Sequence, residues 1–278
     1  MNDVSPIFLS TSVTKSYRYF CHMRWKGRRV CLLCSYRTLY LLSSGHFKCR
    51  RCKHRFKDFT GTYLGRARVP LDELTHVLYM FVLGVPAYRS RWYVRSNLDT
   101  VERLFRLIRL AIYDGLIQHL KNMELAGEIE IDEALFGGHR KGKRGWGAEG
   151  KSLVFGIYQR DGKVITFPVS DRKHDTLIPL ITQHTKKGSL YYSDDHIAYA
   201  TLNLIGKHHV IPHQRQEYVK EETHINGIEG FWSYAKTWLY HYRGVSKQYF
   251  HLYLKEIEFR FNNRDRDLFP LVAEMLVK

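Results

Sequence analysis

The sequence has no long apolar run, few acidic residues and no cysteine after residue 52. A membrane-spanning helix needs roughly 20 predominantly apolar residues in a row, and no stretch approaches that length. The N-terminus also lacks the basic start and apolar stretch of a secretory signal peptide. We therefore expect neither secretion nor membrane insertion, and we place the chain in the cytoplasm.

The shortage of acidic residues leaves a large positive charge. The 278 residues include 44 Lys and Arg against 27 Asp and Glu, a formal net charge of +17. Residues 1–68 hold 15 of the basic residues and only two acidic ones, and the remainder is nearly balanced. An excess of this size indicates an anionic partner, and the obvious polyanion is nucleic acid. The distribution predicts a DNA-binding N-terminal segment attached to a nearly neutral body.

The cysteines predict a metal site. Four of the five form two C-x-x-C pairs with fourteen residues between them: Cys31, Cys34, Cys49 and Cys52. This spacing is typical of a zinc ribbon, in which one structural Zn²⁺ takes four thiolates. Disulfides are the alternative, which the absence of a secretory signal disfavours. Basic residues within and beside the second pair are predicted to contact DNA phosphates, unless they form a merely solvated face: Arg50, Arg51 and Lys53.

The middle of the chain reads as helical. Apolar residues recur at helical spacing over 70–83 and again from about 96 to 116. Arg103, Arg106 and Arg109 lie three apart on another face of the second helix. Short helices that end in a basic one fit a helix-turn-helix, with Arg103 and Arg106 toward DNA. A helical linker with a solvated basic stripe is the other interpretation.

After residue 127 the pattern changes to strands and helices. Strands are predicted at 128–136, 152–159, 163–169, 189–193 and 207–211, and helices near 175–185, 197–204, 226–240 and 247–262. Three successive strands followed by alternating helices and strands describe an α/β domain with a mixed sheet. The predicted organisation is a zinc ribbon at 1–68, a helical segment at 69–126 and the α/β domain at 127–278.

Three carboxylates occupy chemically meaningful positions in this domain. Asp132 lies within the first predicted strand, Asp194 ends the fourth, and Glu229 lies near the start of a helix. Hard cations such as Mg²⁺ prefer carboxylate ligands, and a pair of them supports in-line phosphoryl displacement. Lys236 lies seven residues after Glu229, two helical turns along the same face, and Asn226 lies three before it.

These stretches together resemble the DDE transposases of bacterial insertion sequences that carry an N-terminal zinc ribbon and a ribonuclease H-like catalytic domain (the integrase superfamily). The resemblance spans about residues 20–265. The matching stretches are the four cysteines, residues 131–133 and 136–138 with the basic run at 140–144, residues 192–194 with Tyr199, the helix at 224–236, and residues 258–263.

The resemblance implies an insertion-sequence transposase in the bacterial nucleoid. Asp132, Asp194 and Glu229 would hold two Mg²⁺ or Mn²⁺ ions, and 127–278 would be the catalytic domain. Such an enzyme binds the terminal inverted repeats of double-stranded DNA, cuts at the transposon ends and joins the 3′-hydroxyl ends to target DNA. Pairing two ends implies a homodimer or a larger assembly. The implied DNA contacts in this domain are Lys236, Asn226, Arg140, Lys141, Lys143 and Arg144.

Several alternatives remain at this point. Asp195 follows Asp194 directly and is the other possible ligand, and Asn226 is a possible substitute or helper for Glu229. Another nuclease of the same fold is one functional alternative. A zinc-ribbon DNA-binding regulator, derived from an inactive transposase, is another. Glu130 and Glu133 are expected to be solvated or salt-bridged.

Overall fold

The computed structural model describes residues 5–121, 123–137, 151–211, 225–242 and 244–278. The chain forms two compact units, one of Met1–Gly115 with Arg266–Lys278 and one of Leu116–Asp265. These two units do not coincide with the three predicted segments. Segment 1–68 and most of segment 69–126 lie in the first unit, and the last residues of segment 127–278 also belong to the first unit. Within the described ranges no helix combines the length and apolarity that crossing a bilayer requires.

The first unit is a helical body that carries a small sheet. Its helices are α1 Pro6–Ser10, α2 Val13–Trp25, η1 Leu64–Arg66, α3 Leu71–Val82, α4 Ala87–Ser90, α5 Leu98–Leu120 as far as Gly115, and α9 Leu268–Val277. Sequence patterns predicted α3 and α5. They did not predict α9, whose Phe269 and Leu276 are buried where it contacts α2 and α3. Its partners lie about 200 residues away in sequence, so local patterns could not place it in this unit.

The prediction that Arg109 shares a basic face of α5 with Arg103 and Arg106 is wrong. Arg109 is buried, and its guanidinium lies 5.4 Å from the ring centre of Phe81 and 5.8 Å from that of Phe105. A spacing of three residues falls 60° short of a full helical turn, so Arg109 is rotated about 120° from Arg103, into the apolar stripe. The predicted basic face therefore ends at Arg106.

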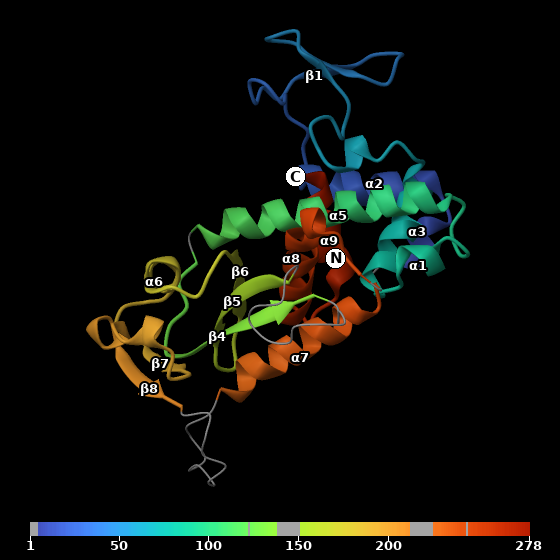
Figure 1. Cartoon of the computed structure of the whole chain (residues 1–278). Coiled ribbons are helices and arrows are strands. Elements are labelled where there is room, and N and C mark those ends of the chain that lie inside the picture. Colours follow the sequence, from blue (N-terminus) through green and yellow to red (C-terminus); the bar gives the residue numbers. More distant parts are fainter. Residues whose placement is uncertain (1–4, 122, 138–150, 212–224, 243) are drawn as a thin grey trace. The chain divides into compact units, whose positions relative to one another are not determined.

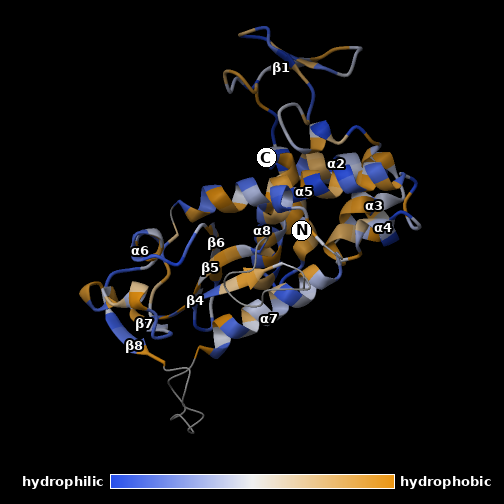
Figure 2. Ribbon diagram, viewed as in Figure 1, coloured by the Kyte–Doolittle hydropathy of each residue, from blue (hydrophilic) through white to orange (hydrophobic). Residues whose placement is uncertain are grey.

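The second unit is built on a five-stranded sheet in the order β6-β5-β4-β7-β8. The strands are β4 Glu128–Phe136, β5 Ser152–Gln159, β6 Val164–Val169, β7 Leu190–Ser193 and β8 Lys207–Val210. β4, β5 and β6 pair antiparallel, whereas β7 and β8 extend the sheet in parallel from β4. The predicted α/β class with a mixed sheet is confirmed. Figure 2 shows the outer strand β8 mainly hydrophilic, whereas the central strand β4 mixes hydrophilic and hydrophobic residues.

Side chains of β4 alternate between two cores. Ile129 and Ile131 pack into the core that includes Leu177 of α6 His174–His184. On the other face, Ala134 and Phe136 pack into the core of α7 Asn226–Tyr240 and α8 Phe250–Asn262. Figure 1 shows α7 running beside the strands of this sheet. Asp132 shares the face of Ala134, so the alternation directs it toward α7.

One predicted helix is wrong. Residues 197–204 form two 3₁₀ helices, η2 Ile197–Tyr199 and η3 Leu202–Leu204. Ala198, Tyr199 and Leu202 are the buried residues of these helices, and Ile197 and Leu204 are exposed. Short segments held by so few buried side chains commonly adopt the tighter 3₁₀ turn.

Side chains of α8 close the free edge of β6. The Asn262 amide accepts from Val164 N and donates to Val164 O, both at 2.8 Å. One turn earlier Glu258 accepts from Thr166 N at 2.9 Å, and Lys255 donates to Thr166 O at 2.9 Å. An unpaired strand edge is a template for aggregation, so these side chains replace a neighbouring strand. This explains part of the motif at 258–263 that the sequence singled out.

His184, at the end of α6, predicts a pH-dependent stability. Its ring is buried and stacked on Phe167, and burial holds its pKa below 6.5, although nearby Glu258 acts in the opposite direction and Lys255 in the same one. The unfolded chain binds more protons as pH falls below 6.5, so stability decreases there. We expect the thermal midpoint of the wild type to fall more steeply than that of His184→Phe between pH 7.5 and 5.5, measured by circular dichroism. Parallel pH profiles for the two proteins would contradict this assignment.

Candidate functional site

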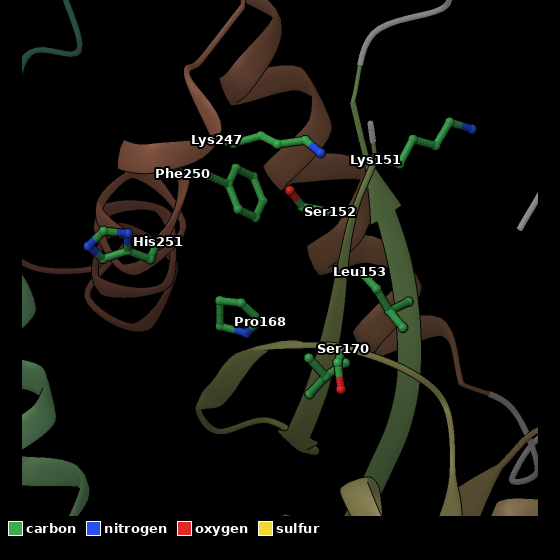
Figure 3. A pocket seen from close by; sticks show the side chains of 9 residues that line it. Lys151, Ser152, Leu153, Pro168, Ser170, Lys247, Phe250 and His251 are labelled. Carbon is green, nitrogen blue, oxygen red and sulfur yellow. The ribbon is translucent and has the colours of Figure 1, made fainter. Parts of the chain in front are cut away.

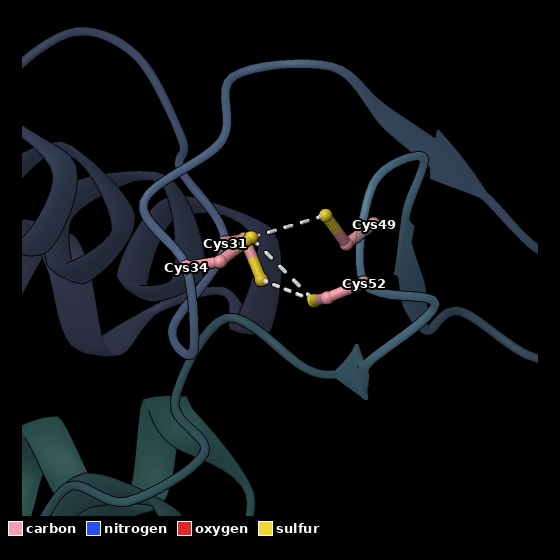
Figure 4. Close-up of side chains that lie close together, drawn as sticks. All are labelled: Cys31, Cys34, Cys49 and Cys52. Atoms are coloured by element: carbon pink, nitrogen blue, oxygen red, sulfur yellow. Dashed lines mark hydrogen bonds between the residues drawn. The ribbon is translucent and has the colours of Figure 1, made fainter.

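The four cysteines of the two pairs converge in the first unit (Figure 4). The Sγ–Sγ distances are 3.5 Å for Cys31–Cys52 and Cys34–Cys52, and 3.6 Å for Cys34–Cys49. Tetrahedral zinc with sulfur at about 2.3 Å requires about 3.8 Å between sulfurs, and no disulfide links these cysteines. The cluster therefore fits a zinc ion.

A small antiparallel sheet shapes the cluster. Its strands are β1 Leu39–Leu41, β2 Phe47–Cys49 and β3 Arg55–Phe56. Each cysteine pair is followed by a residue with positive φ, Ser35 at 56° and Lys53 at 62°, which turns the chain back past its own sulfurs. Arg50 and Arg51 are exposed within the second pair, and Lys53 Nζ donates to Arg50 O at 2.8 Å.

A buried carboxylate joins this region to α2. Asp58 accepts hydrogen bonds from Tyr17 Oη, from Trp25 Nε1 at 2.6 Å and from Arg29 Nε at 2.6 Å. The Asp58 side chain is 3% exposed. A buried carboxylate is costly unless hydrogen-bond donors compensate it. These hydrogen bonds to Asp58 therefore hold the end of the ribbon against the helical body.

In the second unit, Asp132 and Asp194 come from adjacent parallel strands. Glu130 of β4 pairs with Tyr192 of β7, and continuing that register by two residues brings Asp194 opposite Asp132. Burial raises the pKa of Asp132 to about 6, with further contributions from the charges of Glu133 and Asp194. Asp132, in the middle of β4, and Asp194, directly after β7, form an acidic pair that repels a further negative charge and attracts a cation.

The helix that carries Glu229 is held against the same strand. Trp232, one turn after Glu229, donates Nε1–H to Asp132 Oδ2 at 3.0 Å. A side chain at Gly156, the β5 partner of Asp132, would bring its Cβ to 2.7 Å from the Trp232 ring. Glycine at this position therefore lets the indole reach the carboxylate.

The first turn of α7 has its own anchor. Glu130 accepts from Ile228 N at 2.8 Å, and Arg160 Nε donates to Glu130 at 2.9 Å. A Cβ at Gly227 would lie 2.2 Å from the Tyr158 ring, so close packing explains this glycine. It does not explain Gly230, whose Cβ would meet open space. Glu130 is thus buried and salt-bridged, one of the two states expected for it.

Arg172, in the turn before α6, bridges the other acidic groups. Its Nη2 lies 2.8 Å from Glu133 Oε2 and 3.1 Å from Asp194 Oδ2. Glu133 also accepts from Tyr199 Oη at 2.5 Å, and Asp194 Oδ1 accepts from His196 N at 3.2 Å. The two oxygens of Asp194 are thereby oriented by groups from separate segments. Glu133 is salt-bridged, again within expectation.

The remaining predicted residues of this site are exposed. Asn226, Glu229 and Lys236 lie on the exposed side of α7, and Asp195 is exposed next to Asp194. Among the described residues, only the four cysteines bring three or more potential ligand atoms within 4.8 Å of one another. Asp132, Asp194 and Glu229 are therefore spread more widely than that distance, as their mutual repulsion favours.

Three comparisons relate this chain to known proteins. A family model described as the ISXO2-like transposase domain matches residues 124–262, which include all three carboxylates and Lys236. The chain belongs to the ISXO2-like transposase family. It is 34% identical over 116 residues to an uncharacterized transposase-like protein of Haemophilus influenzae, covering 42% of this chain and 94% of that protein. It is 25% identical over 281 residues to an uncharacterized protein in transposable element ISH50 of Halobacterium salinarum, covering 92% of each.

The two arginines of α5 that were predicted to contact DNA in this transposase family member differ in exposure. Arg106 is exposed on α5, whereas Arg103 is partly buried and donates to Ala67 O at 2.6 Å. Four basic residues predicted to contact DNA lie outside the described residues: Arg140, Lys141, Lys143 and Arg144.

Sequence reasoning missed two side chains that orient the acidic pair. Arg172 lies in a turn, and no spacing or motif links it to residues 39 and 22 positions away. Trp232 offered a signal, because it lies one turn after Glu229 on the same helix and carries a single N–H donor. A buried tryptophan beside a candidate carboxylate is worth testing as its hydrogen-bond donor.

Proposed function

We propose that this chain is an insertion-sequence transposase that binds terminal inverted repeats, hydrolyses DNA phosphodiesters at the transposon ends and transfers the 3′-hydroxyl ends to target DNA. The observation that carries the proposal is the parallel register of β4 and β7, which continues to bring Asp194, directly after β7, beside Asp132, with the helix of Glu229 tied to Asp132 through Trp232. The ribonuclease H-like fold of this unit is part of the proposal, and the mixed five-stranded sheet supports it.

Asp132, Asp194 and Glu229 would hold two Mg²⁺ or Mn²⁺ ions. Their carboxylate oxygens are the ligand type that such hard cations take. When bound, such ions stabilise the attacking and leaving oxygens of an in-line displacement. The acidic pair has the matching chemistry, since close carboxylates resist full ionisation without a compensating cation.

The chain's own side chains prepare this arrangement. Trp232 fixes one oxygen of Asp132, Arg172 holds Asp194 against Glu133, and Glu130 holds the first turn of the helix that carries Glu229. Groups that lock a ligand's orientation commonly affect metal affinity by about 10- to 100-fold. Lys236, exposed two turns after Glu229, would contact the DNA backbone, and Asn226 would assist from the same face.

The first unit would supply DNA binding. The cysteine cluster would hold one structural Zn²⁺, and the exposed Arg50, Arg51 and Lys53 around it would meet phosphates. Arg103 and Arg106 of α5 would add contacts from the helical body. Because both transposon ends have to be brought together, we propose a homodimer or a larger assembly on DNA.

A cleavage and joining assay tests the proposal. Labelled duplexes carrying the sequences that flank the gene are incubated with the full zinc-containing chain, unlabelled target DNA and a concentration series of Mg²⁺ or Mn²⁺. We expect metal-dependent nicks at the ends, followed by joined products. Tight end binding without cleavage under every metal condition would contradict the proposal and favour a DNA-binding regulator.

A further inference from the structure

A cavity of about 330 Å³ lies in the second unit, apart from the acidic pair. It forms where β5 begins, β6 ends and the η4–α8 segment starts, with η4 at Lys247–Tyr249. Its apolar floor includes Phe250, which packs against Phe136 at 5.7 Å between ring centres. Figure 3 shows the Lys247 side chain extending over the Phe250 ring toward Ser152.

The polar lining of the cavity is suited to an anion. Lys151, Lys247 and His251 line it together with the hydroxyls of Ser152 and Ser170, and none of the described lining residues is acidic. Figure 3 shows the Lys247 side chain over the cavity and the Lys151 side chain directed away from Phe250, so Lys247 is the lysine placed to attract a negative charge there. Hydroxyl and ammonium donors around an open cavity match the oxygens of a phosphate group.

The position of the cavity relates it to the acidic pair. Ser152 pairs with Phe136, four residues beyond Asp132 on β4, a distance of about 13 Å along the strand. α7 follows the same direction, because it is anchored at Glu130, contacts Asp132 and packs Trp232 on Phe136. Lys236 lies one turn beyond Trp232, toward the cavity end of the sheet.

We infer that this cavity is a phosphate subsite that binds the DNA backbone about 13 Å along β4 from the acidic pair, with Lys247 as its charged contact and Lys151 at its rim. The inference rests on the proposed function, because it takes DNA as the substrate of the same unit. A DNA strand that passes the acidic pair and Lys236 would reach the cavity along the face of the sheet that α7 covers. The subsite would fix the register of the strand rather than its sequence.

The salt dependence of DNA binding tests this assignment. The full zinc-containing chain is titrated against a 30-base-pair duplex, a length of about three helical turns, by fluorescence anisotropy at several NaCl concentrations. Each lost phosphate contact makes the negative slope of log K against log[salt] shallower by about 0.9. We expect Lys151→Ala/Lys247→Ala to make the slope shallower by about 1, and Lys151→Arg/Lys247→Arg to restore it.

Two exposed lysines at the opposite end of the sheet provide a control of equal charge. Lys163 follows β5 and Lys187 precedes β7, and both are exposed. We expect Lys163→Ala/Lys187→Ala to leave the slope unchanged. An unchanged slope in the cavity variant, or an equal decrease in both double variants, would overturn the inference.

A second arm tests whether the cavity takes a phosphate group. Sodium phosphate replaces NaCl at equal ionic strength, and the wild type and cavity variant are compared. A selective loss of wild-type DNA binding is expected, because free phosphate competes with the backbone for the same contacts, and equal effects on both proteins would overturn the inference. A cavity that takes free phosphate but no DNA would leave the salt slopes of the wild type and the cavity variant equal, which also overturns it. If the wild type cleaves DNA and the cavity variant has the same salt slope as the wild type, the subsite is contradicted and the proposed function stands. If the wild type binds no DNA at all, the proposed function itself is contradicted.

Discussion

Asp194→Asn is expected to reduce DNA strand cleavage by at least about 10³-fold. The substitution removes one negative charge from the acidic pair and keeps the size of the side chain. If the carboxylates supply about 4 kcal/mol of transition-state stabilisation through the ions they hold, the loss corresponds to about three orders of magnitude in rate. Asp132→Asn and Glu229→Gln are expected to behave in the same way. Initial rates of end nicking in Mg²⁺ and Mn²⁺ measure the effect.

Asp195→Asn is the matched control for this prediction. Asp195 is the adjacent aspartate, is exposed, and has the same charge and shape as Asp194. Asp194 differs in being held by Arg172 and by His196 N. We expect Asp195→Asn to cleave at close to the wild-type rate. A wild-type rate in Asp194→Asn combined with loss in Asp195→Asn would show that the ligand has been assigned to the wrong residue.

Unfolding provides the necessary check on these variants. Asp132 is mostly buried and its pKa is raised to about 6, so a neutral amide there removes a charge that burial disfavours. The amide carbonyl that Asp132→Asn introduces would still accept from Trp232. We therefore expect the thermal midpoint of this variant to match or exceed that of the wild type, which separates lost cleavage from lost folding.

Removal of zinc is expected to unfold the cysteine ribbon and abolish tight DNA binding. The ribbon has a small core, in which Phe56 and two of the cysteines are the buried apolar residues. Structural zinc sites contribute about 10–16 kcal/mol of apparent binding free energy at neutral pH, which is comparable to the whole stability of a typical domain, about 5–15 kcal/mol. Cys52→Ser or a strong chelator should therefore release one zinc per chain, measured by elemental analysis, and weaken end binding by at least 100-fold, or about 2.7 kcal/mol.

Cys21→Ala is the control for the zinc prediction. Cys21 is buried in α2, takes no part in the cluster, and has a pKa raised by burial. We expect this variant to retain one zinc per chain and wild-type DNA affinity. Wild-type protein that contains no zinc, or that binds DNA equally well after chelation, would contradict the structural role of the cluster.

The sequence by itself determined the features that depend on local patterns. The spacing of two cysteine pairs predicted a cluster that the structure brings together, because each short pair already places two sulfurs near one point. Alternation in 128–136 predicted a strand with Asp132 opposite Ile129 and Ile131, since side chains of a strand alternate between faces. Helical spacing predicted α7 with the same bounds that the structure has.

Only the tertiary structure decided which distant groups meet. Arg172 bridges Glu133 and Asp194, α8 closes the edge of β6, and α9 returns to the first unit. Helical or strand periodicity in the sequence could not predict these contacts. Each contact joins distant segments, which meet only because of how the whole sheet and its helices pack. The cavity of Lys151 and Lys247 arises in the same way, from residues 96 positions apart that the sheet edge and the start of α8 bring together.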